Sequence, residues 1–519
     1  MKHSYKIYDD EYLWCGSTAF GERNPFNKNS EFYQNMYLSS SNQTMPLIIS
    51  NKGRYFWSDK PIIIEIKDGF LNLEGEGIVE YKVGTTLKEA YMDAMKNHFP
   101  FNGRVLPDTF FKTAQYNTWM HFNYFPTQEG VLNYADNLIK HGFAPGIFIL
   151  DEGWHGRYGE WEFDFERFPN PKQMVDRLHQ LGFKVMLWVT PYVCPGGFNF
   201  AYHSRPQEFY HHKDADKLFI RNKSGEVVLF KWWNGFSAQL DFTKEWDREY
   251  MQRRLDYLQE TYGVDGFKFD AGAPFLYSKE WSVNGDFDDN DEMFARNKAW
   301  FEFGSQYDYH EWMGVYRAGG KNTIQRLGDK APLWAPGGLN ALVPSSILQA
   351  LMGSPFTCPD MIGGGSWTYS ANPEFHIEQE LFVRMAQVSA FMPMMQFSWA
   401  PWEILDDKHL QMVKDANALH NKFSDYVMGL IRDSYTSGQP IIRSLDYVDA
   451  EGGFGGVIDE FMVGDDLLVA PVVTKETYSR VVKFPKGKWQ DQDGNIYLGN
   501  TEELLECPIE KVLYFTRVK

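Results

Sequence analysis

The feature that most constrains the fold is a series of short apolar runs in the middle of the chain, each followed by amphipathic sequence. Gly146–Leu150, Lys184–Val189 and Gly266–Phe269 are nearly continuous apolar segments of strand length. Such segments are typical of strands buried on both faces, as in a parallel sheet. The first of them is followed by Asp151 and the third by Asp270. The sequence therefore predicts parallel strands with acidic residues at their carboxyl ends.

The intervening segments predict helices. Asn170 is a candidate cap for a helix with Pro171 at its first position and Gly182 just beyond its end. A second helix is expected from about Lys244 to Thr261, with Gly263 after it.

Alternation of strands and helices over some 300 residues predicts an α/β fold, a (β/α)8 TIM barrel. The competing fold is a doubly wound open sheet, which the sequence disfavours because no glycine-rich phosphate loop follows the first strand. Strand-like, turn-rich sequence on both sides of the barrel predicts an N-terminal β-sandwich-like region and a C-terminal β-sandwich. The expected domains are residues 1–105, 106–425 and 426–519.

Composition and charge narrow the classes of molecule that the protein could bind. The chain of 519 residues carries a formal net charge of -18, which argues against nucleic-acid and anionic membrane partners. The N-terminus lacks the apolar run of a signal peptide, and no stretch has the length and apolarity of a membrane span. The four cysteines, Cys15, Cys194, Cys358 and Cys507, form no metal-type or redox-type pair. We therefore expect a cytoplasmic protein, and the oligomeric state, including a homo-oligomer, stays open.

Two carboxylates can cleave a glycosidic bond when one is ionised and the other is protonated. Asp270 ends a predicted strand, and Lys268 lies two residues earlier on the same strand face, where its charge would keep Asp270 ionised. Asp329 lies in a loop-like setting that would favour the protonated acid. Spacing alone also allows a structural ion pair between Lys268 and Asp270, with Asp329 as a turn residue.

Ordered motifs around these residues resemble glycoside hydrolase family 31, the retaining α-glycosidases. The resemblance runs from about Asn117 to the C-terminus. It rests on the following segments: Trp161–Val189, Leu240–Thr243, Lys268–Gly272 (KFDAG), Arg326–Lys330 (RLGDK), Pro359–Gly365 (PDMIGGG), Gly464–Val473 and Phe484–Asp491.

The resemblance implies that Asp270 is the nucleophile and Asp329 the general acid/base, with a covalent glycosyl-enzyme between them. No cofactor and no metal is implied, and the partner is a small oligosaccharide or glycoside. The residues expected to contact the sugar are Asp151, Glu152, Trp154, Trp188, Trp233, Lys268, Arg317, Arg326 and Asp360.

Departures from the family pattern bear on the sugar. Typical α-glucosidases of the family carry Arg-Asn-His after a late barrel strand, where this chain has Gln396, Phe397 and Ser398. Loss of these polar groups weakens the case for plain glucose, because a site built around one hydroxyl discriminates against sugars that lack it. The chain looks most like the α-galactosidase-like branch that includes the myogenesis-regulating glycosidase, so α-galactosides are the expected substrates.

Other activities stay open. α-Glucosidase, α-xylosidase and sulfoquinovosidase activities are alternatives within the family, the last because Arg326 and Lys321 could meet an anion. A non-catalytic carbohydrate-binding protein on the same fold is the alternative from another class. Two weak metal patterns, His211, His212, Asp214 and Asp216, and the segment Gly285–Asp291, are better explained as surface loops.

Overall fold

The computed structural model describes residues 1–38, 42–193, 217–286 and 290–518. It divides into two compact units. Unit 1 comprises Met1–Ala114 and Arg317–Lys519, and unit 2 comprises Gln115–Tyr316. Among the described residues, no helix combines the length and the apolar character needed to cross a membrane.

Unit 2 is built on five parallel strands that follow one another in chain order. They are β9 (Gln115–Asn117), β10 (Ile147–Leu150), β11 (Lys184–Val189), β15 (Gly266–Phe269) and β17 (Tyr309–Trp312). The apolar runs predicted as strands are therefore confirmed, and all of β10 and β15 is buried. A doubly wound sheet reverses its strand order at a switch point, whereas these five strands keep one direction of progression, as in a barrel.

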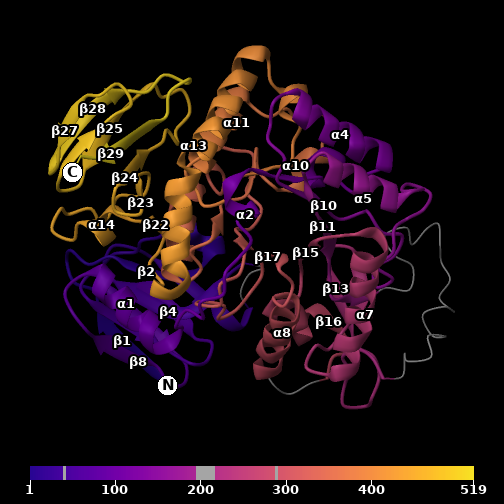
Figure 1. Cartoon of the computed structure of the whole chain (residues 1–519). Coiled ribbons are helices and arrows are strands. Elements are labelled where there is room, and N and C mark those ends of the chain that lie inside the picture. Colours follow the sequence, from indigo (N-terminus) through magenta and orange to yellow (C-terminus); the bar gives the residue numbers. More distant parts are fainter. Residues whose placement is uncertain (39–41, 194–216, 287–289, 519) are drawn as a thin grey trace. The chain divides into compact units, whose positions relative to one another are not determined.

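Helices connect the strands of unit 2. They are α4 (Gln128–Lys140), α5 (Pro171–Gln180), α7 (Glu245–Tyr262) and α8 (Asn290–Gly304), with α4 and α5 side by side (Figure 1). The predicted boundaries of α5 and α7 are confirmed to within a few residues. Asn170, however, makes no side-chain cap hydrogen bond. Gly263 ends α7 in the left-handed conformation at φ +81°, which glycine adopts without steric cost.

A small antiparallel sheet is inserted between β11 and α7 and extends to the segment after β15. Its strand order is β12 (Tyr192–Val193), β14 (Gly235–Gln239), β13 (Leu229–Trp232) and β16 (Ser282–Val283). The turn from β13 to β14 carries Trp233, whose side chain is 44% exposed.

The N-terminal part of unit 1 contains the two sheets of the predicted β-sandwich-like region. The first has the order β1 (Lys2–Lys6), β7 (Phe70–Glu74), β6 (Ile63–Lys67) and β3 (Phe32–Asn35), and the second β2 (Leu13–Ser17), β4 (Thr44–Ser50), β5 (Arg54–Trp57) and β8 (Val79–Lys82). Side chains from both sheets share one apolar core, which includes Leu13, Ile48 and Leu71. Helix α1 (Leu87–His98) packs on β4 and β5 (Figure 1).

The remainder of unit 1 contributes further parallel pairs. Strand β18 (Gln325–Arg326) pairs with β19 (Thr357–Cys358), and β20 (Met361–Ile362) pairs with β21 (Gln396–Phe397). Helices α9 (Leu342–Leu351) and α11 (Gln379–Ser389) form the connections within these two pairs, and α11 packs on the long helix α13 (Asp407–Ser437).

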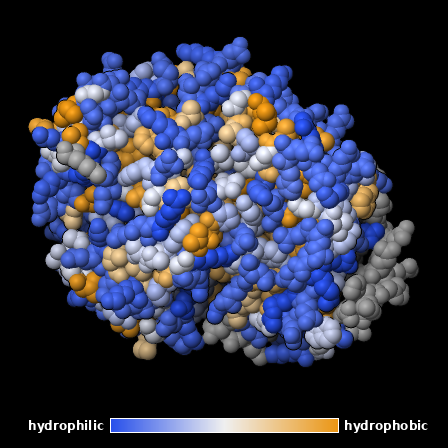
Figure 2. Space-filling model, in the orientation of Figure 1, coloured by the Kyte–Doolittle hydropathy of each residue, from blue (hydrophilic) through white to orange (hydrophobic). Residues whose placement is uncertain are grey.

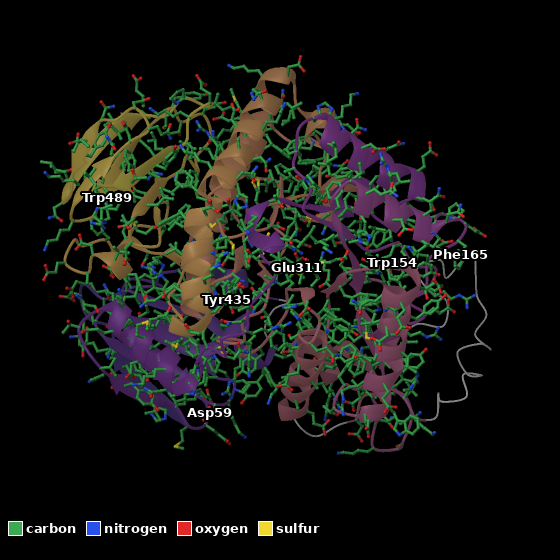
Figure 3. All side chains as sticks on the ribbon, viewed as in Figure 1. Asp59, Trp154, Phe165, Glu311, Tyr435 and Trp489 are labelled. Atoms are coloured by element: carbon green, nitrogen blue, oxygen red, sulfur yellow. The ribbon has the colours of Figure 1, made fainter. Side chains whose placement is uncertain are left out.

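The C-terminal region is antiparallel, as predicted. A six-stranded sheet has the order β22 (Ile442–Arg443), β23 (Phe461–Val463), β24 (Leu467–Ala470), β29 (Leu513–Arg517), β26 (Lys488–Gln490) and β27 (Ile496–Leu498), and β25 (Ser479–Phe484) pairs with β28 (Thr501–Glu506). Trp489 (labelled in Figure 3) is fully buried in the core of this region. The visible surface is mainly hydrophilic (Figure 2), in keeping with the charged composition.

Candidate active site

Carboxylates cluster at the carboxyl ends of the parallel strands of unit 2. Asp151 follows β10 and Asp270 follows β15, and both side chains belong to buried residues. The Asp270 carboxylate accepts hydrogen bonds from Trp188 Nε1 at 3.0 Å and from its neighbour's backbone, Ala271 N, at 2.7 Å. One donor reaches each carboxylate oxygen, so the two bonds fix the orientation of the group.

The backbone after Asp270 is strained. Ala271 has φ +58°, a left-handed conformation that is costly for a residue with a side chain. Gly272 follows at φ +68°, where an added Cβ would lie 2.5 Å from the Trp300 ring. Such outliers are common in active sites, where the surrounding structure holds them in place.

Lys268 forms its salt bridge with Asp151. Its Nζ lies 2.5 Å from Asp151 Oδ2, and both side chains are almost completely buried. The position of Lys268 two residues before Asp270 predicted that its charge acts on Asp270. Strand β11 lies between β15 and β10, with Trp188 as the register partner of Lys268, so the salt bridge links the two strands on either side of β11. Asn117 Nδ2 also donates to Asp151 Oδ2 at 2.8 Å.

Replacing Lys268 with Met should leave Asp151 as a buried charge without its salt-bridge partner. We expect Lys268→Met to lower the free energy of unfolding by about 3–5 kcal/mol in urea denaturation. Lys184→Met is the matched control, because Lys184 Nζ pairs with Asp265 at 2.9 Å but its side chain is 44% exposed. The control should lose about 1 kcal/mol or less. Equal losses in the two variants would contradict the buried pair.

Glu152 is the centre of a second polar cluster in unit 2. Its Oε1 accepts hydrogen bonds from Tyr158 Oη at 2.5 Å and from Asn234 Nδ2, and its Oε2 accepts one from Trp233 Nε1 at 3.2 Å. Burial, which disfavours the charged form, raises the pKa of Glu152 to about 8, while the bonds from Tyr158 and Trp233 oppose that rise. The exposed ring of Trp233 is thus tied to a carboxyl group at the end of β10.

The raised pKa of Glu152 predicts a pH dependence of stability. Between the ordinary carboxyl value of 4.5 and about 8, the folded protein keeps a proton that the unfolded chain releases. The contribution of Glu152 to stability is therefore complete below pH 4.5 and is lost as the pH rises towards 8. Urea unfolding at several pH values should show that Glu152→Gln removes this decline, which for one proton amounts to about 1.4 kcal/mol per pH unit. If the free energy of unfolding depended on pH in the same way in the wild type and in Glu152→Gln, the raised pKa of Glu152 would be contradicted.

Trp154 and Trp188, which were predicted to contact the sugar, are both buried. Trp154 (labelled in Figure 3) is fully buried, and its Nε1 donates to the backbone oxygen of Trp188 at 2.8 Å. Trp188 is 1% exposed and donates in turn to Asp270. In this arrangement Trp154 supports Trp188, which supports Asp270. That either ring contacts substrate stays a prediction.

The remaining predicted residues lie in unit 1. Asp329, three residues after the end of β18, has a side chain 37% exposed. Arg326 Nη1 lies 3.0 Å from Asp329 Oδ1 and 2.6 Å from Asp360 Oδ1. The other oxygen of Asp360 accepts hydrogen bonds from the backbone nitrogens of Lys330 at 2.6 Å and Gly365 at 3.0 Å.

Arg317 occupies a different setting within unit 1. Its Nη2 lies 3.0 Å from Asp59 Oδ1, and its guanidinium group stacks 5.2 Å from the centre of the Trp57 ring. Its backbone has φ +54°. The contact between Arg317 and the sugar stays a prediction.

A small polar cavity adjoins Asp329 in unit 1. Its volume is about 140 Å³, and Glu22, Asn42, Asp329, Lys330 and Ser345 contribute its polar side chains. Burial lowers the pKa of Lys330 from its ordinary value, and its Nζ donates to the backbone oxygen of Gly328 at 2.8 Å. Glu22 and Asn42 come from the N-terminal region, so residues far from the motifs reach the surroundings of Asp329.

Several residues of these clusters were missed by the sequence analysis. Asn117 ends the first parallel strand, and that position was the available signal. Tyr158 and Asn234 lie in loops, and only the adjacency of Asn234 to Trp233 pointed to it. Glu311, buried on β17 (labelled in Figure 3), is in register with Lys268, but β17 lacks the apolar run that would have revealed the strand.

Metal binding finds no support in the part of the chain that the structure describes. There, no three His, Cys, Asp or Glu side chains are grouped so that they could hold a metal ion. The histidine pair His211 and His212 with Asp214 and Asp216 lies outside the described residues, as does part of Gly285–Asp291.

Parallel β/α units with carboxylates at the strand ends define an α/β-barrel protein with an acidic site. Residues 109–428 match the model of the glycosyl hydrolases family 31 TIM-barrel domain, and residues 438–518 match the family 31 C-terminal domain. The chain therefore belongs to glycosyl hydrolase family 31, and the predicted TIM barrel is confirmed.

Curated relatives agree with this family. The chain is 30% identical over 442 residues to the myogenesis-regulating glycosidase of Mus musculus, an alignment that covers 84% of this chain and 60% of that protein. It is 25% identical over 421 residues to alpha-glucosidase 2 of Bacillus thermoamyloliquefaciens, covering 76% of this chain and 51% of the relative. The chain thus spans only about half to three fifths of the length of these relatives.

Solved structures show the same fold. A family 31 dextranase of Flavobacterium johnsoniae, complexed with glucose, superposes with a TM-score of 0.81 at 18% identity, covering 99% of this chain and 66% of that one. A cycloalternan-degrading enzyme of Trueperella pyogenes gives a TM-score of 0.82 at 15% identity, covering 100% of this chain and 81% of that one.

Proposed function

We propose that this protein is a retaining exo-α-glycosidase that removes terminal α-linked sugars, with Asp270 as nucleophile and Asp329 as acid/base. The observation that carries the proposal is the contrast between the two carboxylates. Asp270 is 9% exposed and is oriented by two N–H donors, as a group that must attack one carbon requires. Asp329 is 37% exposed and borders a polar cavity, as a group that exchanges protons with a leaving group and then with water requires.

The mechanism has two displacements. In the first, an oxygen of Asp270 bonds to the anomeric carbon while Asp329 gives its proton to the departing glycosidic oxygen. In the second, water bonds to the anomeric carbon and passes a proton to Asp329, and the ester to Asp270 breaks. Two inversions give net retention, so NMR of the first-formed sugar should show the α-anomer. An initial β-anomer would contradict this mechanism.

We further propose that the preferred sugar is an α-galactoside. Gln396 and Ser398, both fully buried, stand where typical α-glucosidases of the family carry an arginine and a histidine. Asp151 and Glu152, at the end of β10, supply carboxyl groups for sugar hydroxyls. The likeness to the myogenesis-regulating glycosidase supports a glycosidase of this family, and the α-glucosidase relatives make α-glucosidase activity the second candidate.

Hydrolysis of aryl α-glycosides tests the choice of sugar. The kcat/KM for the α-galactoside should exceed that for the α-glucoside and the α-xyloside by roughly 100-fold or more, because a misplaced hydroxyl leaves buried polar groups unpaired. A higher kcat/KM for the α-glucoside would overturn the sugar assignment but keep the glycosidase. If the protein cleaves none of the three but binds galactose in calorimetry, a non-catalytic sugar-binding protein is the better account.

A further inference from the structure

We propose that Arg326 is a positioning residue for catalysis, which holds the Asp329 carboxylate in place and stabilises its charged form, and that Asp360 is the fixed anchor of this arrangement. The proposal rests on the proposed function, since it assigns Asp329 the role of acid/base. Arg326 and Asp360 were predicted from the family resemblance to contact the sugar.

The geometry of Arg326 points to Asp329. The Arg326 side chain is 2% exposed, and its Nη1 is shared between Asp329 Oδ1 at 3.0 Å and Asp360 Oδ1 at 2.6 Å. The same nitrogen lies 3.0 Å from the backbone oxygen of Leu327. A guanidinium group held so tightly inside the protein is suited to orienting a carboxylate, because charge-assisted hydrogen bonds are short and directional.

Contacts within unit 1 hold both carboxylate oxygens of Asp360 in place. Its side chain is completely buried, one oxygen binds Arg326, and the other accepts the backbone nitrogens of Lys330 and Gly365. Its φ of +140° is unusual for a residue with a side chain. Glycine at position 365 leaves room for both carboxylates, since a Cβ there would lie 2.8 Å from Asp329 Oδ1 and 2.9 Å from Asp360 Oδ1. Asp360 therefore ties the loop that carries Asp329 to the turn after β20.

The charges around Asp329 in unit 1 are of both signs. Arg326 contacts it directly, Lys330 is its chain neighbour, Asp360 binds the same guanidinium nitrogen, and Glu22 lines the same cavity. Arg326 forms a salt bridge with Asp329, so its removal should change the proton affinity of Asp329.

The two displacements need Asp329 in opposite states. Asp329 must carry a proton while the glycosidic oxygen departs, and it must be a carboxylate when water attacks the glycosyl-enzyme. A cation beside the carboxylate lowers the pH at which the proton is lost, by about 1–3 pH units for a close pair. Arg326 thus favours the second displacement and moves the working range of the enzyme towards acid.

The pH profile of kcat/KM tests this proposal with two variants. Arg326→Gln removes the cation, while Arg326→Lys keeps it. For an alkyl α-galactoside, whose departure needs the proton, the alkaline limb should move up by about one pH unit or more in Arg326→Gln. In Arg326→Lys, the alkaline limb should move by no more than about half as far. With α-galactosyl fluoride, which departs without a proton, Arg326→Gln should show no such displacement.

Two results would overturn the proposal. An unmoved alkaline limb in Arg326→Gln, with kcat reduced alike on both substrates, would show that Arg326 only supports the fold. The double variant Arg326→Gln/Asp360→Asn also removes the charge that Arg326→Gln would leave buried without its partner, so it guards against failure to fold.

A measurement without turnover separates this proposal from the proposed function. Carbon-13 NMR, with the signal assigned from Asp329→Asn, should show that the Asp329 carboxyl titrates at higher pH in Arg326→Gln than in the wild type. Equal titration midpoints would overturn the role of Arg326 even if the protein hydrolyses no glycoside.

Discussion

Asp270→Ala should lose roughly 10⁴-fold or more of kcat on an aryl α-galactoside, because the variant lacks the carboxylate that is proposed to form the covalent intermediate. Initial rates at saturating substrate give this ratio directly. The fold should survive, since the described part of the chain gives the Asp270 carboxylate two hydrogen bonds, from Trp188 and from the adjacent Ala271. Circular dichroism and thermal unfolding check this.

Asp265→Asn is the matched control for the nucleophile. Asp265 directly precedes β15, at the end opposite Asp270, and it accepts hydrogen bonds from Lys184 Nζ at 2.9 Å and Val185 N at 2.8 Å. This variant should lower the melting temperature but keep kcat within a few fold. If Asp270→Ala retained activity comparable to that of the control, Asp270 could not be the nucleophile.

Asp329→Ala should lose activity to an extent that depends on the leaving group. With an alkyl α-galactoside, kcat/KM should fall by about 10²–10⁴-fold, the usual contribution of a general acid. With α-galactosyl fluoride the loss in kcat/KM should be much smaller, because fluoride leaves without a proton. Azide should raise the turnover of the variant and give α-galactosyl azide, since an anionic nucleophile needs no general base.

The control for the acid/base is Asp465→Ala. Asp465, like Asp329, is a partly exposed aspartate of unit 1 that pairs with an arginine, in this case Arg443. It should respond to neither the leaving group nor azide. An equal loss of activity on all substrates in Asp329→Ala, without azide rescue, would contradict the role of Asp329 as acid/base.

The sequence predicted the strands of unit 2 well where their residues are almost all apolar. Lys184–Val189 and Gly266–Phe269 match β11 and β15 at both ends, since continuous apolar runs bounded by polar residues leave little choice of boundary. The late strands β18, β19, β20 and β21 have two residues each, too few to show a period.

The sequence predicted which residues make up the candidate site better than it predicted which of them contact one another. Asp151, Lys268 and Asp270 were recognisable as polar groups at or near strand ends, but their pairing was not. Lys268 pairs with Asp151, which is 117 positions away in the chain. Spacing along one strand cannot reveal such a contact, because it depends on the register of neighbouring strands. The hydrogen bonds from Tyr158 and Asn234 to Glu152 were hidden for another reason, because they depend on the conformation of loops.

Trapping the glycosyl-enzyme tests the central claim most directly. A 5-fluoro-α-galactosyl fluoride slows the second displacement, so the covalent intermediate should accumulate and add the mass of one fluorinated sugar to the intact protein. Peptide mapping should place this sugar on the Asp270 side chain, and Asp270→Ala should take up none. A label on any other residue, or turnover of the fluoride with no covalent adduct and β-anomer as the first product, would contradict the account.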